Sequence, residues 1–268
     1  RLTSEAPWAA RSSHAAAALP DGDVLLLGGL AQDLLNDVWR WSPRQCTLLP
    51  DLDMELALHY ELECSYACVP SQIYGQWKRL PDAPWAPRQG HAVTWTSSGL
   101  ILLGGRTALG FENDVWRWIS GGEFCSLEWQ GRWEQLTPSA AWAPRYGHSL
   151  VGFAPPGGNN VTTVLLLGGF GGWPWPRNVT REPMEDPVAP RNDLWCGNEA
   201  LANFAEWTEL APSGPQSARM AAAAVEAPTL GEYKLLFYGG YDSSARHMQD
   251  LWKWSGENAT SACKVEID

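Results

Sequence analysis

The hexapeptide NDVWRW stands at residues 36–41 and again, letter for letter, at residues 113–118. An identity of this length within one chain indicates a repeating structural unit. Related versions follow as NDLWCG at residues 192–197 and as QDLWKW at residues 249–254. The four copies therefore divide the chain into four units.

Other landmarks recur in step with these copies. An arginine-led tetrad precedes each copy as RSSH, RQGH, RYGH and RMAA, starting at residues 11, 88, 145 and 219. Between the tetrad and the copy lies an apolar run that ends in paired glycines: VLLLGG, LILLGG, VLLLGG and LLFYGG. After the first three copies a further segment begins with tryptophan: WKRL, WEQL and WTEL. Each unit thus has four short runs separated by turn residues.

Four short apolar or alternating runs per unit are typical of a four-stranded antiparallel sheet. A sheet with two apolar faces cannot bury both of them alone, so the sheets are expected to stack around an axis as the blades of a propeller. The recurring tryptophans would then fill the space between neighbouring blades. The sequence therefore predicts an all-β propeller with four four-stranded antiparallel blades.

This pattern resembles the kelch-repeat family of β-propellers, in which Gly-Gly closes the second strand of a blade and a spaced Trp marks the third. The resemblance covers residues 2–254 and implies a single domain over residues 1–268. Its blades are expected at about residues 11–80 with an insertion at 42–76, about 88–136, about 145–210 with an insertion at 170–191, and about 219–268.

The number of blades leaves two arrangements open. Kelch propellers resemble one another in having mostly six or seven blades, whereas this sequence shows four units. The chain either closes as a four-bladed ring or forms part of a larger propeller. In a closed ring, residues 1–3 would complete blade four, although KVEID at residues 264–268 could also be its outer strand.

Composition restricts the kinds of partner to be expected and indicates the cellular compartment. The net charge of -11 disfavours nucleic acid, and no apolar stretch is long enough for insertion into a bilayer. An even number of cysteines, six, occurs with three Asn-x-Thr sites, at Asn160, Asn178 and Asn258. Together they favour a secreted or cell-surface protein with N-glycans and disulfides.

All six cysteines are assigned to one rim of the propeller, after a third strand and before the next first strand. Disulfides there would clamp hairpins or join blades, but spacing does not select a pairing. A metal site is the competing interpretation. The cysteines are Cys46, Cys64, Cys68, Cys125, Cys196 and Cys263.

The opposite face carries the candidate binding residues. In an antiparallel blade, the segments that enter the first strand and the loops between second and third strands share this face. Trp173 and Trp175, stiffened by flanking prolines in the insertion, are candidates for docking a protein or a glycan. So are six recurring residues, for which the alternative is a purely structural role: Trp8, Trp85, Trp142, Arg11, Arg88 and Arg145.

Catalytic patterns are weak. Asp51, Glu55 and His59 stand four apart and could grip a metal on one helix face, but a solvated helix is the plainer interpretation. Plant nitrile-specifier proteins and galactose oxidase are metal-dependent kelch enzymes, and the ligand patterns of neither are matched here. We therefore expect no enzyme and no cofactor. The alternatives are a structural subunit of an extracellular polymer or, less favoured, a metal-dependent enzyme.

Overall fold

A computed structural model describes residues 5–48, 66–70, 75–120, 131–153, 163–172, 188–199, 202–226 and 233–256. The regular structure in these ranges is strand, apart from one short 3-10 helix, η1 (Ala202–Phe204). The predicted all-β fold is confirmed. None of the described helical structure is long and apolar enough to span a membrane.

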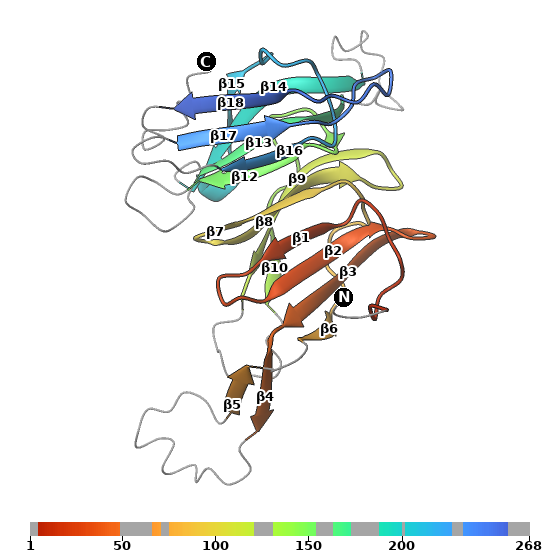
Figure 1. The fold of residues 1–268 in the computed structure, drawn as a ribbon, viewed down its shortest axis with the longest axis vertical. Coiled ribbons are helices and arrows are strands. Elements are labelled where there is room, and N and C mark those ends of the chain that lie inside the picture. Colours follow the sequence, from red (N-terminus) through yellow and green to blue (C-terminus); the bar gives the residue numbers. More distant parts are fainter. Residues whose placement is uncertain are drawn as a thin grey trace.

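Four antiparallel sheets follow one another along the chain as the four blades of a propeller (Figure 1). Blade one consists of β1 (Ala15–Ala18), β2 (Val24–Leu30), β3 (Leu34–Ser42) and β6 (Gln76–Leu80). Blade two consists of β7 (Ala92–Thr96), β8 (Gly99–Arg106), β9 (Phe111–Ile119) and β10 (Arg132–Thr137).

The other two blades vary this plan. In blade three, β11 (Arg145–Tyr146) and β12 (Ser149–Phe153) both pair with β13 (Thr163–Gly171), which is followed by β14 (Ala189–Asn198) and β15 (Trp207–Ala211). Blade four contains β16 (Ala223–Glu226), β17 (Tyr233–Tyr238) and β18 (Leu251–Gly256). Both segments considered for its fourth strand, residues 1–3 and 264–268, lie outside the described residues.

The paired glycines differ from their predicted role as strand ends. In the first three blades the second strand continues past them, and the ladder shifts register at the pair. Gly28 and Gly29 have φ of 52° and 101°, a backbone conformation that is costly for residues with a Cβ. The pair therefore forms a bulge, which bends the strand while its pairing goes on.

The insertion at residues 42–76 contains an additional hairpin that the sequence did not reveal. β4 (Arg44–Leu48) pairs with β5 (Tyr66–Pro70) outside the four blades. In Figure 1 it extends from the end of blade one. The loop that joins these strands lies outside the described residues, together with the metal candidates Asp51, Glu55 and His59.

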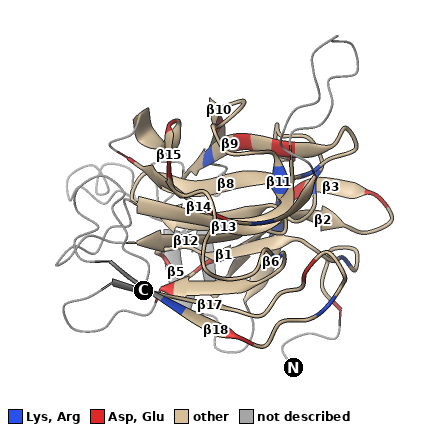
Figure 2. Ribbon diagram, turned by 90° about the horizontal axis from the view of Figure 1, so that it is seen from above, with Lys and Arg blue, Asp and Glu red and all other residues tan. Residues whose placement is uncertain are grey.

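The core lies between neighbouring blades. Leu25 and Leu27 of blade one pack with Leu100 and Leu102 of blade two, and equivalent clusters join blades two and three and blades three and four. Trp116, Trp195 and Trp252 pack against these clusters, so three of the four recurring indoles fill the space between sheets, whereas Trp39 packs near Trp8 instead. The hub strands β1, β7 and β12 carry no charged residue, and β12 is accordingly tan in Figure 2.

The blades follow one another in an arc. At the hub β1 packs against β7, β7 against β12, and β12 against β16. Among the described strands no comparable packing joins β16 to β1. Figure 1 shows blade one and blade four at opposite ends of the molecule.

Candidate functional site

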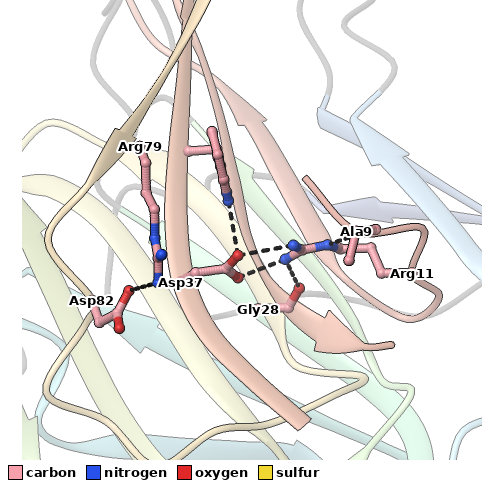
Figure 3. A network of polar contacts seen from close by, with 7 residues as sticks. Ala9, Arg11, Gly28, Asp37, Arg79 and Asp82 are labelled. Atoms are coloured by element: carbon pink, nitrogen blue, oxygen red, sulfur yellow. Dashed lines mark hydrogen bonds and ion pairs between the residues drawn. The ribbon is translucent and has the colours of Figure 1, made fainter. Parts of the chain in front are cut away.

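Each blade holds its recurring arginine in the same hydrogen-bond network, shown for blade one in Figure 3. Arg11 donates two hydrogen bonds to the Asp37 carboxylate, at 2.6 and 2.8 Å, and a third to the carbonyl of Gly28. Arg88 pairs in the same way with Asp114, and Arg145 with Asp193. The network ties the entrance of the first strand to the second and third strands of the same blade.

The Trp and the Asn of the repeated motif complete this network. The indole of Trp39 donates to Asp37 at 2.8 Å, and each later copy repeats the bond. The amide of Asn36 donates to the carbonyl of Ala83, in the segment that enters the next blade. Each Asp thus serves two donors, while each Asn fixes the connection between blades.

Asp193 and Asp250 are held in their charged form. Burial raises the pKa of Asp193, but hydrogen bonds and charge from Arg145 outweigh it, so this pKa lies below its ordinary value. In blade four, the hydrogen bond from Arg219 likewise lowers the pKa of Asp250. A paired carboxylate is a poor general base, and these groups act as structural ties.

The structure removes several predicted binding residues from the surface. Trp85 and Trp142 are 1% and 0% exposed because they lie between blades, where each ring packs near its following arginine. The side chains of Arg11, Arg88 and Arg145 are at most 2% exposed. Trp8 is half-buried against Trp77, with ring centroids 4.2 Å apart. The buried positions of Trp85 and Trp142, and of the three arginines, match the structural alternative rather than a docking role.

The recurring histidines divide into two groups. His91 and His148 are buried beside the glycine pair of the preceding blade, whereas His14 is exposed. Burial, followed by the positive charge of Arg88, lowers the pKa of His91 to about 3. Burial, followed by Arg145, lowers the pKa of His148 to about 3 as well. Both imidazoles are therefore neutral at ordinary pH.

Several predicted site residues lie outside the described ranges. They are Trp173, Trp175, Asn160, Asn178, Asn258, Cys64, Cys125 and Cys263. Cys46 and Cys68 are described by backbone alone. Cys196 was assigned to the connection after a third strand, but it lies inside β14, fully buried among blades three and four. This correction follows from the length of β14, which continues to Asn198.

Three aromatic residues from two blades meet on the predicted binding face. We call Phe111, Tyr146 and Phe170 the aromatic cluster. The rings of Phe111 and Tyr146 stack at 5.5 Å with an interplanar angle of 10°, and Phe170 meets both edge-on at about 6 Å. All three residues are half-buried, so part of each remains exposed.

A guanidinium group lies beside the aromatic cluster. Arg106 stands opposite Phe111 in the β8–β9 ladder and is exposed. Burial and the neighbouring Tyr241 raise the pKa of Tyr146, while Arg106 opposes the change. Tyr146 therefore remains a neutral phenol. The site combines stacking surface, a hydroxyl and a guanidinium, and the described residues contain no group of three or more His, Cys, Asp or Glu that could hold a metal.

Sequence reasoning missed the aromatic cluster because its members lie far apart in the chain. One signal was available: Tyr146 occupies the variable second position of the Arg-x-x-His tetrad, where the other units have serine, glutamine and methionine. A side chain that breaks a repeat is a better functional candidate than one that obeys it.

Comparison with known proteins supports the fold alone. No protein-family model matches the chain, and no curated protein matches it. A solved structure of YjhT, itself a propeller, is similar with a TM-score of 0.57 and 14% sequence identity. The match covers 100% of this chain and 70% of that chain.

Proposed function

We propose that this chain is a kelch-repeat propeller that acts outside the cell as a non-catalytic binding module for a protein or a glycan. The aromatic cluster is the observation that carries the proposal. Partly exposed aromatic residues that are held by two blades lose little conformational freedom when a partner binds. Aromatic and arginine side chains also dominate the binding energy of known interfaces.

The kelch assignment rests on the physical role of the repeated residues. The arginine at the entrance and the Asp-x-Trp pair act together in every blade, and the first three blades add the glycine bulge. These are the same landmarks that carry the resemblance in the sequence. The secretory assignment rests on the three glycosylation sites and the even number of cysteines.

The insertion follows the proposed site directly in the sequence. Phe170 lies in β13, and Trp173 and Trp175 follow within five residues along the chain. The two tryptophans therefore extend the list of candidate contacts from the aromatic cluster into the insertion. A binding surface made from both would use rings from blades two and three.

Substitution of the aromatic cluster tests the proposal. The fluorescently labelled chain is applied to a glycan microarray and, as a separate arm, to intact cells of its source. The double variant Tyr146→Ala with Phe170→Ala is expected to bind at least about tenfold more weakly, because two aromatic contacts are lost.

The matched control is Leu109→Ala, in the turn between β8 and β9 on the same face. Leu109 is 91% exposed and lies outside the aromatic cluster. Near-ultraviolet circular dichroism establishes that each variant is folded. Unchanged binding by a folded double variant would contradict the site assignment.

A further inference from the structure

Blade four presents an apolar face that the other blades keep covered. Val225, Tyr238 and Leu251, one from each of its strands, are 58%, 51% and 63% exposed. Their neighbours in the ladder place them on the same sheet, with Val225 opposite Leu236, and Tyr238 opposite both Ala223 and Leu251. Exposed apolar groups gathered in this way indicate an interaction surface.

The repeat shows what these positions do elsewhere. Tyr238 stands where the other three blades have leucine, and Leu251 stands where they have valine or leucine. All six equivalents are buried to 1% exposure or less: Leu27, Leu103, Leu167, Val38, Val115 and Leu194. In each case the following blade covers them.

A polar side chain on blade four is also more exposed than its equivalents in the other blades. The Asp250 side chain is 41% exposed, whereas its equivalents Asp37, Asp114 and Asp193 are 8–11% exposed. In blade one, the amide of Gly29 donates to the carbonyl of Arg88 in the following blade, at 2.9 Å. Gly169 donates to Arg219 in the same way, also at 2.9 Å.

The glycine pair of blade four lacks this neighbour among the described residues. A Cβ at Gly28 would lie 3.1 Å from the Arg88 carbonyl oxygen, and one at Gly168 would lie 3.0 Å from that of Arg219. At Gly239 the nearest atom is the Met248 oxygen, 3.7 Å away in the same blade. The open face is therefore one half of an interface that already occurs three times in this molecule.

We infer that a further blade of the same repeat, carried by the same polypeptide, packs on the open face of blade four. Such a blade supplies what the three existing interfaces supply: alternating apolar residues, a buried indole, and the carbonyl of an entrance arginine. This inference does not depend on the proposed function.

The space expected beside the open face of blade four favours a further blade over a second copy of the chain. The four blades cover 70% of YjhT, so the rest of a propeller of that size has room for one or two units of about 50 residues. A second copy would bring four blades and exceed this space. The existing blades are joined within one polypeptide by short segments, such as residues 81–87 and 138–144.

The first measurement is the intact mass of the native protein, purified from its source, deglycosylated and reduced. The expected mass exceeds 29.5 kDa by at least one unit of about 50 residues. A native mass of 29.5 kDa would overturn the inference.

The second measurement compares Leu251→Lys in the native protein and in the 268-residue chain. In the 268-residue chain the change lies on an open face and shifts Tm by less than about 2 °C. In the native protein it buries a charge between blades and lowers Tm by at least about 5 °C. Leu109→Lys, in an exposed turn, is the matched control and shifts Tm little in both proteins.

Equal, small shifts in both proteins would overturn the inference, because the face would then be open in the native protein too. As a final measurement, light scattering gives the molar mass of the 268-residue chain in solution. A monomer is expected. A dimer that Tyr238→Lys dissociates would identify a second copy as the occupant and would overturn the inference.

Discussion

At the scale of single residues, the Asp of the repeated motif is the most connected group in each blade. It accepts two hydrogen bonds from arginine and one from the tryptophan two residues later. Removing one partner of a buried ion pair leaves an uncompensated charge, which is why such pairs are strongly interdependent. The Asp and the Arg are therefore expected to tolerate replacement only together.

The buried histidines predict a pH dependence of stability. His91 and His148 have pKa values of about 3 in the folded protein, against 6.5 ordinarily. Below pH 6.5 the unfolded chain binds protons that the folded chain does not, so the free energy of unfolding falls as pH decreases. The expected slope for each histidine rises from about 0.7 kcal/mol per pH unit at pH 6.5 toward about 1.4 near pH 5. Denaturant titrations between pH 6.5 and 5 measure it.

The double variant His91→Gln with His148→Gln is expected to flatten this slope, whatever its effect on stability at neutral pH. His247→Gln is the control, because His247 is exposed. A double variant that keeps the slope of the unmodified chain would show that other groups cause the dependence.

At the scale of elements, the β4–β5 hairpin selects one cysteine pairing that spacing left open. Cys46 and Cys68 stand directly opposite each other in this antiparallel ladder. Opposite Cα atoms in such a ladder lie about 4.5–5.5 Å apart, within the range that a disulfide spans. We predict a Cys46–Cys68 disulfide, which non-reducing peptide mapping would detect as one linked peptide pair.

Reduction of this bond is expected to change the unfolding of the blades little, because the hairpin lies outside the four sheets. A peptide map that links Cys46 to any other cysteine would refute the pairing. If the pairing holds, Cys46→Ser frees the thiol of Cys68 and Cys68→Ser frees that of Cys46, so thiol titration of each denatured variant should find one thiol more than in the unmodified chain.

At the scale of the whole molecule, stability is expected to vary along the arc. Blades two and three are covered on both sides, whereas blade four has one open face. In repeat proteins each unit is stabilised by its nearest neighbours, so end units open first. In the 268-residue chain, hydrogen exchange of β17 and β18 should be faster than that of β13 and β14. Equal protection of these two strand pairs would contradict the gradient.

The sequence by itself determined the four blades and their strand order. These features depend on pairings within about 50 residues, which alternation and turn residues encode locally. The hairpin β4–β5 and the continuation of strands through Gly-Gly were missed, because a bulge and an extra ladder depend on backbone geometry rather than residue type.

Only the tertiary structure decided which side chains are available to a partner. Trp85 and Trp142 look like docking residues in the sequence, yet a neighbouring blade buries them. Phe111, Tyr146 and Phe170 form one site although three separate segments supply them. Tyr238 and Leu251 carry the same pattern as buried residues and are exposed. Exposure depends on what another part of the molecule covers, and a local pattern does not contain that information.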